Sequence, residues 1–298
     1  MSRLPYYANF WLRYLTKSFN RQTPDKRFLE EQKSNIDYYC KIDQPVILQK
    51  GIKLQDINLL KNSGYTYDLY NILYPFREKL RFNFIPGDVT TVPEYPSFVK
   101  SRPIEGKNDN SVLLPLDSQR HFKFVNDRNK YLDKLDGIVW RGAAYQKHRL
   151  RFLESCSELE FVNAGNTAVQ KNRYIPFARP KMSINEQLKY KFVLSLEGND
   201  VATNLKWIMS SNSVCVMPRP KYETWYREGT LIPNHHYIEI RDDFSDIKSK
   251  FNYYLKNPDL CNLIIANANE YTKLYLNNKN ILNLSRSVAL KYYERTLH

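Results

Sequence analysis

The residues best suited to chemistry in this chain follow a short apolar run in its second half. Residues 191–196 (KFVLSL) have the composition of a strand that is buried on both faces, and they end at the polar turn EGND. Apolar residues from 201 to 209 then recur at helical spacing, and Asp200 is placed to cap that helix. A strand, a glycine-containing turn and a helix N-terminus direct backbone N–H groups at a bound anion, often a phosphate. The same pattern also describes an ordinary capped connection, so on its own it indicates only a candidate anion site.

The elements around this turn alternate between strand and helix. We expect strands at 138–140, 159–162, 191–196, 214–217 and 237–240, and helices at 149–156 and 201–209. This alternation over residues 137–241 predicts a mostly parallel α/β sheet. The chain after residue 243 is expected to be helical, at 247–255, 258–276 and 281–297.

The first half of the chain is less regular. Residues 28–80 are expected to be helix and loop with a short strand near 47–49, and 81–85 a half-buried strand that ends at the PGD turn. Residues 93–115 are rich in proline and polar side chains, which is typical of a loop. Residues 1–27 are basic and aromatic. They form either a helix in a membrane interface or a helix packed on its own domain.

Length and charge restrict the class of protein. A chain of 298 residues is long enough for two domains, and its formal net charge of +14 implies an acidic partner: nucleic acid, an anionic lipid surface or a phosphorylated substrate. The lysines and arginines are spread along the chain, and no nucleic-acid-binding motif is visible. We therefore expect a partner other than nucleic acid.

The cysteines indicate a reducing compartment, and the hydropathy indicates that no segment spans a membrane. Cys40, Cys156, Cys215 and Cys261 lie far apart without a metal-ligand spacing, so we expect free buried thiols. No apolar run approaches the ~18–20 residues that span a bilayer, and the first residues lack the features of a secretory signal. We expect a cytoplasmic protein, and the sequence leaves open a peripheral location on the inner membrane.

Several segments resemble glycosyltransferase family 90, which includes LpsA-type bacterial lipopolysaccharide glycosyltransferases, fungal capsule-associated proteins and animal protein O-glucosyltransferases. The similar segments are EGNDVATNLKW, KYETWYREG and HHYIEIRDD, with weaker matches at PGDVTTVPEYPSFVKSRP and IVWRGAAYQKHR. They extend over about residues 80–245, and they are most similar to the bacterial lipopolysaccharide branch.

The resemblance implies a GT-B-like α/β fold: two Rossmann-like domains with an interdomain cleft and a helical C-terminal segment. We expect an N-terminal acceptor-binding domain over residues 1–136 and a C-terminal nucleotide-sugar-binding domain over residues 137–298. The last helix is expected to pack back on the N-terminal domain.

The activity implied by the resemblance is transfer of a hexose, glucose or galactose, from a UDP-sugar to a lipopolysaccharide or lipooligosaccharide core, with inversion. Asp88 lies in an Asp-x-x-x-Val-Pro context that is similar to the catalytic base of the protein O-glucosyltransferases. Such a base takes the proton of the acceptor hydroxyl. From its residues alone, the PGD turn favours an aspartate that stabilises a turn, and the resemblance reverses that preference.

The donor site must stabilise the negative charge of a diphosphate leaving group. Animal members of the family carry a phosphate-binding arginine where this chain has Asn204, so another cation is needed here. No Asp-x-Asp triplet is present, which predicts a metal-independent reaction without a cofactor. The predicted donor-binding residues are Arg141, Gly142, His148, Arg149, Gly198, Asn199, Asp200, Val201, Ala202, Asn204, Lys206, Trp225, Glu228 and His236.

Two other functions remain open from the sequence. One is a nonenzymatic basic protein that binds polyanions or nucleic acid, in which the charge is the function. The other is a related transferase that acts on capsule or protein acceptors. For the favoured function, the expected partners are a UDP-sugar, a lipopolysaccharide core acceptor and an anionic membrane surface.

Overall fold

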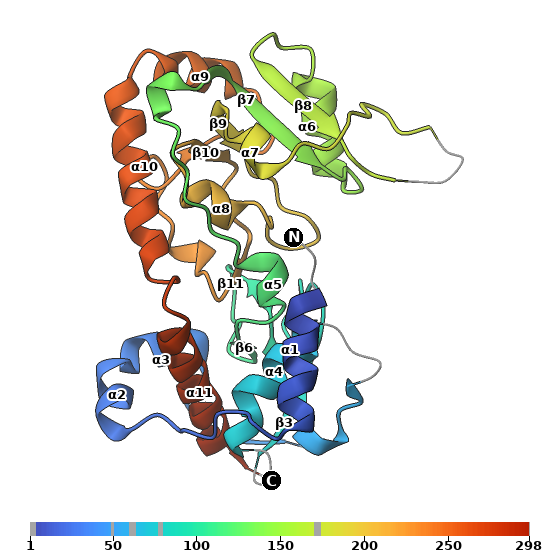
Figure 1. Ribbon diagram of the computed structural model, residues 1–298, viewed down its shortest axis with the longest axis vertical. Helices are drawn as coiled ribbons and strands as arrows, with labels where there is room; N and C mark the ends of the chain where they lie inside the picture. The colour runs from blue at the N-terminus through green and yellow to red at the C-terminus, as the bar shows by residue number, and fades with distance from the viewer. Residues whose placement is uncertain (1–3, 49–50, 60–63, 77–79, 170–173, 298) are drawn as a thin grey trace. The chain divides into compact units, whose positions relative to one another are not determined.

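The computed structural model describes residues 4–48, 51–59, 64–76, 80–169 and 174–297, in two compact units (Figure 1). Unit 1 contains residues 1–121, 221–229 and 275–298, and unit 2 contains residues 122–220 and 230–274. Residues 122–136 therefore group with unit 2, and two later segments group with unit 1. The predicted assignment of acceptor binding to residues 1–136 and donor binding to residues 137–298 stays a prediction, as does the GT-B arrangement.

Unit 2 is built on a sheet of five parallel strands in the order β12-β10-β9-β7-β8. The strands are β7 (Leu135–Gly142), β8 (Val162–Asn166), β9 (Tyr190–Leu194), β10 (Val214–Met217) and β12 (Ile238–Glu239). The central strands are apolar because both of their faces are covered, and Phe192, Val193 and Leu194 are fully buried. The predicted parallel α/β sheet is thus confirmed.

The helices of unit 2 are α6 (Lys147–Cys156), α7 (Ile184–Gln187), α8 (Leu205–Met209), α9 (Ile247–Leu255) and α10 (Pro258–Lys273), with a 3-10 turn at Tyr131–Asp133. Aromatic contacts join them to the sheet. Phe152 of α6 lies edge-on against Trp140 of β7, and Phe251 of α9 stacks on Phe161 with ring centroids 4.2 Å apart. The core of the unit is therefore continuous from the strands to the covering helices.

Two predicted elements of unit 2 differ from the structure. Helix α8 begins at residue 205 rather than 201, and its N-cap is Asn204 rather than Asp200. Val201 and Ala202 are buried without being helical, so their apolar spacing reflects burial of a turn. Strand β8 begins at Val162, and residues 159–161 form the turn that precedes it.

Unit 1 contains a four-stranded sheet in the order β2-β3-β4-β6 and two short strand pairs. The sheet strands are β2 (Ile52–Lys53), β3 (Arg81–Phe84), β4 (Ser97–Val99) and β6 (Ser111–Leu113), of which only β2 runs antiparallel to its neighbour. The pairs are β5 (Ser101–Pro103) with β11 (Tyr222–Thr224), and β1 (Val46–Ile47) with β13 (Thr296–Leu297). The prediction of a loop over residues 93–115 is therefore wrong, since three strands of three residues lie between its prolines.

The helices of unit 1 are α1 (Leu4–Leu15), α2 (Lys26–Glu31), α3 (Lys33–Tyr39), α4 (Gly64–Leu73), α5 (Ser118–His121) and α11 (Asn278–Arg295). The unit also has 3-10 turns at Leu54–Asp56 and Tyr74–Phe76. A further 3-10 turn, Glu228–Thr230, lies where the chain leaves the unit. Helix α11 packs on α3 and α4. Its fully buried Tyr292 donates a hydrogen bond to the Pro96 carbonyl oxygen (2.9 Å) and accepts one from the Asn83 N–H (3.1 Å). These bonds fix the last helix to the four-stranded sheet.

Helix α1 packs on its own unit along one face. Phe10 stacks on Tyr67 of α4 with ring centroids 4.2 Å apart, and Tyr7 and Trp11 contact the same ring. On its other face the helix exposes Leu12 (64%) and Leu15 (74%). The aromatic residues thus belong to the core, while the exposed leucines leave a surface available for other contacts.

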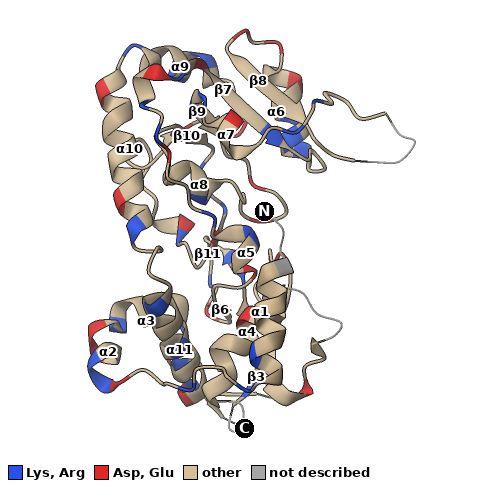
Figure 2. Ribbon diagram, in the orientation of Figure 1, with Lys and Arg blue, Asp and Glu red and all other residues tan. Residues whose placement is uncertain are grey.

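Charged residues are distributed over both units of the described chain. Lysines and arginines lie on helices and loops of both units, with acidic side chains among them (Figure 2). Within the described ranges, no helix combines the length and apolar character needed to cross a membrane. All four cysteines are free and buried, as predicted, and burial raises the pKa of the Cys40 and Cys156 thiols to about 11.

Candidate active site

The carboxyl ends of β7 and β9 form the switch point of the unit 2 sheet. From β7 the chain continues to β8 at one edge, and it then returns to form β9 on the other side of β7. In open parallel sheets, ligands bind in the crevice outside the strand ends where the strand order reverses. Two loops lie at this position, residues 143–146 and 195–204, and the second contains the predicted donor residues from Gly198 to Asn204.

Arg149 of α6 holds these two loops together. Its Nη1 donates to the Ala143 carbonyl oxygen in the first loop (2.9 Å). Its Nη2 and Nε donate to the carbonyl oxygens of Leu196 (2.8 Å) and Glu197 (2.7 Å) in the second loop. The guanidinium also lies over the ring of Trp140, 5.8 Å from its centroid. Arg149 therefore sets the spacing of the loops at the switch point.

His148 and Gln146 add two links between the same loops. The Nε2 atom of His148 lies 2.7 Å from the Glu197 carbonyl oxygen, which makes it the donor in that bond. The side-chain amide of Gln146 donates to Oδ1 of Asn199 (2.9 Å). With Arg149, these bonds bring three predicted residues, His148, Arg149 and Asn199, into one cluster.

The turn at residues 198–202 folds back on itself. The Gly198 N–H donates to the Asp200 carbonyl oxygen (2.8 Å). Asp200, Val201 and Ala202 are all buried, at 2%, 4% and 5% exposure. Their side chains are therefore directed into the protein, and the turn offers its backbone and Asn199 to the loop surface.

Arg141, at the end of β7, also bonds mainly to the protein backbone. Its Nε donates to the Pro180 carbonyl oxygen (3.0 Å), and its Nη1 to the carbonyl oxygens of Trp140 (2.9 Å) and Asn163 (2.8 Å). Burial lowers its pKa from the ordinary arginine value. Next to it, a Cβ at Gly142 would lie 2.6 Å from the Trp140 ring, so glycine is required there by packing. Both residues hold β7 and its neighbours in place.

The side chain of Asn204 is likewise engaged in hydrogen bonds within the protein, and that of Lys206 is enclosed. The side-chain amide of Asn204 donates to the Leu194 carbonyl oxygen (2.9 Å), and its Oδ1 accepts from the Ser195 hydroxyl (3.1 Å). Lys206 has no exposed surface. The asparagine thus joins the end of β9 to the start of α8.

Trp225 and Glu228 belong to unit 1, whereas these loops belong to unit 2. Trp225 stacks on Tyr39 with ring centroids 3.8 Å apart, and its carbonyl oxygen accepts the Tyr39 hydroxyl (2.9 Å). The Glu228 carboxylate accepts from the backbone N–H (2.6 Å) and hydroxyl (3.0 Å) of Thr224. Both side chains are buried, and both stabilise the loop that carries them.

His236 belongs to unit 2 but is enclosed by its own loop. Its Nδ1 accepts the Ile232 N–H (2.9 Å), and its ring lies against those of His235 and Tyr271. Burial, with a smaller contribution from His235, lowers the pKa of His236 to about 4. The imidazole is therefore neutral near pH 7 and acts as a hydrogen-bond acceptor within the loop.

Asp88 lies in unit 1 at the centre of a charged cluster. The turn before it requires Gly87, whose φ is +101°. The Oδ1 atom of Asp88 accepts from Nζ of Lys100 (2.6 Å) and from the Tyr65 hydroxyl (3.2 Å), and Nη1 of Arg120 lies 3.8 Å away. The Asp88 side chain is 18% exposed and that of Lys100 only 1%. Lys100 and Tyr65 thus orient the carboxylate, and part of it remains accessible to solvent.

The sequence interpretation missed the neighbours of Asp88. Lys100 follows β4, Arg120 and His121 belong to α5, and Tyr65 belongs to α4. Lys100 was hidden because its surroundings were predicted to be loop. One signal could have found it, since PSFVKSRP is part of a segment that resembles the family.

Comparison with known proteins identifies the family. The family model described as Glycosyl transferase family 90 matches residues 116–296. The chain is also 42% identical over 261 residues to the O-glucosyltransferase LpsA of Dichelobacter nodosus, an alignment that covers 87% of this chain and 82% of that protein. The chain belongs to glycosyl transferase family 90. It is a glycosyltransferase, as the sequence indicated.

More distant similarity extends to viral proteins. This family 90 chain is 28% identical over 201 residues to the uncharacterized protein 035R of Invertebrate iridescent virus 3, covering 59% of this chain and 18% of the viral protein. It is 26% identical over 113 residues to the uncharacterized protein 179R of Invertebrate iridescent virus 6, covering 36% of this chain and 9% of that protein. In both cases the similarity is confined to a small part of a longer protein.

The matched range includes the switch-point loops of this family 90 chain. Residues 143–146 and 195–204 both lie within residues 116–296, as does Arg120. Asp88 and Lys100 lie outside that range. Assignment of a catalytic role to Asp88 therefore depends on its geometry and on its sequence context.

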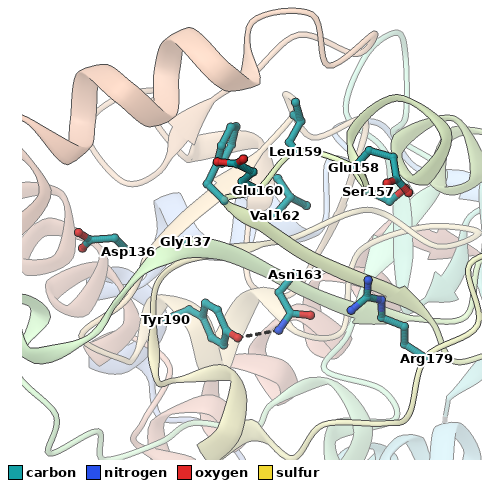
Figure 3. A pocket seen from close by; sticks show the side chains of 11 residues that line it. Asp136, Gly137, Ser157, Glu158, Leu159, Glu160, Val162, Asn163, Arg179 and Tyr190 are labelled. Atoms are coloured by element: carbon teal, nitrogen blue, oxygen red, sulfur yellow. Dashed lines mark hydrogen bonds between the residues drawn. The ribbon is translucent and has the colours of Figure 1, made fainter.

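A pocket at the opposite end of the unit 2 sheet differs from the switch point. It has a volume of about 420 Å³ and is lined by residues at the starts of β7, β8 and β9 (Figure 3). The Asn163 side-chain amide donates there to the Tyr190 hydroxyl (2.6 Å), and Glu158 and Glu160 lie at the rim. Because it lies at the amino ends of the strands and carries carboxylates, this pocket is unsuited to a diphosphate.

Metal ligands do not cluster in the described part of the chain. It contains no group of three or more histidine, cysteine, aspartate or glutamate side chains arranged to hold a metal ion. The side chains that link the switch-point loops are those of Gln146, His148, Arg149 and Asn199, none of which is a carboxylate. Metal independence of the reaction stays a prediction.

Proposed function

We propose that the chain transfers a hexose from a UDP-sugar to the core of a lipopolysaccharide or lipooligosaccharide, with inversion at the anomeric carbon. The similarity to an O-glucosyltransferase favours glucose as the sugar. We also propose that the two α/β units form a GT-B enzyme. In it, unit 2 binds the donor and unit 1 the acceptor.

The observation that carries this proposal is the position of the switch point. Two loops meet at the carboxyl ends of β7 and β9, they lie within the range of the family match, and residues of α6 link them. Such crevices bind nucleotides in open α/β sheets. The nucleoside diphosphate is therefore placed against residues 143–149 and 195–204.

In this proposal the loops at residues 143–146 and 195–204 recognise the diphosphate mainly through the shape of the crevice and the positive charge near it. His148 and Arg149 lie beneath the loops, and Arg149 contributes a fixed positive charge close to them. Arg141 acts as a positioning residue because its donors are directed at carbonyl oxygens. We leave Lys206, Trp225, Glu228 and His236 out of the direct donor contacts because each is buried.

The chemical step assigned to unit 1 is general-base catalysis by Asp88. A hydroxyl oxygen of the acceptor attacks the anomeric carbon, and its proton moves to the Asp88 carboxylate. The bond between that carbon and the β-phosphate oxygen breaks, and UDP leaves with the electron pair. Lys100 and Tyr65 orient the carboxylate through Oδ1.

The acceptor of such a reaction lies in a membrane. We propose that α1 contributes to contact with an anionic membrane surface, because it exposes Leu12 and Leu15 beside the basic Arg13. In this proposal the protein is a peripheral enzyme at the cytoplasmic face of the inner membrane.

The proposal is tested with purified protein, UDP-glucose, UDP-galactose and lipooligosaccharide acceptors, with the anomeric configuration of the product read by NMR. We expect UDP and one UDP-sugar to raise the melting temperature, since a ligand that binds the native state stabilises it. We also expect transfer to continue in the presence of a chelator. Salt-dependent binding of nucleic acid without transfer or hydrolysis of any UDP-sugar would contradict the proposal.

A further inference from the structure

Unit 1 contains a large cavity that the proposed mechanism does not use. It has a volume of about 800 Å³ and lies among α1, α4, α5 and the start of α11, with all of its lining residues in this unit. This volume is within the range of about 300–1,000 Å³ that is typical of small-molecule sites. The cavity is therefore large enough for more than one sugar ring.

The inner part of the cavity is aromatic. It is lined by three aromatic rings that are each less than 10% exposed: Phe10 of α1, Tyr67 of α4, and Phe19. Phe10 packs against both of the other rings, with centroid distances of 5.5 Å to Phe19 and 4.2 Å to Tyr67. This packing holds the rings in fixed positions, so they provide a rigid apolar surface.

A buried carboxylate fixes one wall of the cavity. Asp68 of α4 accepts hydrogen bonds from the Tyr6 hydroxyl (2.6 Å) and from the N–H (2.8 Å) and hydroxyl (3.1 Å) of Ser118. Burial raises the pKa of Asp68 to about 6. These bonds join α1, α4 and α5, so the wall is ordered without a ligand.

The rim of the cavity is polar and carries one cation. Asn9, Asn71, Gln119 and Asn278 come from four different helices, and Arg13 of α1 lies among them. Within the part of the chain that the structure describes, none of these five side chains forms a hydrogen bond or ion pair to another residue. The rim therefore presents amide donors and acceptors together with a guanidinium.

We propose that this cavity binds an acidic oligosaccharide, a segment of the acceptor that carries carboxylate or phosphate groups. The aromatic rings match the apolar C–H faces of pyranose rings, and primary amides both donate to and accept from hydroxyl groups. The guanidinium of Arg13 pairs with the anionic substituent. This inference rests on the proposed function and adds a second acceptor site to it.

Helix α5 connects the cavity with Asp88. Ser118 bonds to Asp68 in the cavity wall, Gln119 lines the rim, and Arg120 lies 3.8 Å from Oδ1 of Asp88. All of these residues belong to unit 1. The cavity rim and the proposed base are thus joined by about one turn of helix, which rises about 5.4 Å.

The test is calorimetric titration of the full chain with delipidated core oligosaccharide, in three forms: native, dephosphorylated and carboxyl-reduced. Asn9→Trp places a large ring at an exposed rim position without altering the core, and we expect it to abolish binding. Arg13→Gln should weaken binding of the native form about tenfold, because one hydrogen-bonded charge is lost. Arg13→Gln should have little effect on binding of the modified oligosaccharide that lacks the anionic group recognised by Arg13. The two modified forms show whether that anion is phosphate or carboxylate.

Matched controls separate the cavity from the surface in general. Asn280→Trp places the same ring at an exposed position of α11 outside the cavity, and Arg128→Gln removes an exposed arginine of unit 2. Both controls should bind the oligosaccharide as the wild type does, and all four variants should bind UDP normally. Equal binding by Asn9→Trp and the wild type, or absence of binding by the wild type to every form, would overturn the inference. Failure of the proposed function has a different signature, which is loss of UDP-sugar binding in the wild type.

Discussion

Two carboxylates of unit 1 pair with cations that are two residues apart in the sequence, and they differ in their access to solvent. Asp88 pairs with Lys100 and keeps 18% of its side chain exposed. Glu223 pairs with Arg102, and both side chains are enclosed, at 2% and 0%. The same ionic contact can therefore leave a carboxylate reachable by a substrate or hold it entirely within the fold.

The enclosed pair has a structural explanation. Arg102 donates to Glu223 (2.8 Å), to the Tyr38 carbonyl oxygen (2.8 Å) and to the Ser111 carbonyl oxygen (3.2 Å). Glu223 also accepts a short hydrogen bond from the Tyr38 hydroxyl. The pair ties β5 to β11, which come from distant parts of the sequence. Access to solvent thus distinguishes Asp88, the candidate base, from Glu223, which cross-links two strands.

The largest effect expected from this comparison concerns Asp88. Asp88→Asn keeps the size of the side chain and an acceptor for Lys100, but it cannot take a proton from the acceptor hydroxyl. We expect transfer to fall by ~10²–10⁴-fold, with UDP affinity unchanged by calorimetry.

The control for Asp88→Asn is Asp109→Asn, which removes a carboxylate that pairs with Lys107 on the surface of the same unit. This variant should transfer sugar at the wild-type rate. Both variants are compared well below their melting temperatures, so that loss of the charge beside Lys100 is not mistaken for loss of catalysis. Near-normal turnover by folded Asp88→Asn protein would remove Asp88 from the mechanism.

The second prediction concerns the enclosed pair. Glu223→Ala leaves the Arg102 guanidinium buried without its partner, and we expect the free energy of unfolding to fall by about 3–5 kcal/mol. Urea denaturation measures this loss. Arg102→Met combined with Glu223→Met removes both charges and should recover much of the stability. A Glu223→Ala protein that is as stable as the wild type but inactive would reverse the assigned roles of the two carboxylates.

The third prediction extends the comparison to unit 2, where Arg141 bonds to carbonyl oxygens rather than to a carboxylate. Arg141→Gln should lower the free energy of unfolding by about 1–3 kcal/mol, because buried acceptors lose a charged donor. Its control is Arg151→Gln, at an exposed position of α6, which should be neutral. If Arg141→Gln instead lost UDP affinity without losing stability, Arg141 would be a direct donor contact.

The smallest expected effect concerns exposed apolar residues of α1. Leu12→Ser combined with Leu15→Ser should lower binding to anionic vesicles by about tenfold or less, with no change in the melting temperature, because neither side chain is buried. Leu263→Ser combined with Leu274→Ser changes two equally exposed leucines of unit 2 and serves as the control. Binding should also weaken with salt. Equal vesicle binding by both double variants would contradict a role of α1 at the membrane.

The sequence predicted much of unit 2 because its strands are continuous apolar runs. The predicted strand at 214–217 and the predicted helix at 247–255 coincide with β10 and α9. In unit 1, strands β4, β5 and β6 have three residues each and contain serine or proline, so periodicity has too few positions to act on. Its pairing depends on contacts over long sequence distances, which a local pattern does not contain.

The candidate site shows the same difference. Strand ends and turns are visible locally, so the loop with Gly198 and the nearby His148 and Arg149 of α6 could be predicted. The direction of each side chain could not, because it depends on burial. Arg141 and Lys206 were chosen for their charge, yet one bonds to backbone carbonyl oxygens and the other is enclosed. Residues gathered around Asp88 by the fold, such as Arg120, carried no sequence signal of their own.

The discontinuity of unit 1 has a consequence for biosynthesis. A ribosome releases residues 122–274 before α11, so all the strands of unit 2 are available to fold while unit 1 still lacks its last helix. Tyr292, which anchors the sheet that leads to Asp88, emerges near the end of translation. Nascent chains arrested before residue 275 should therefore resist proteolysis in their second half and remain sensitive in their first. Unit 1 then completes its fold only after α11 has been synthesised.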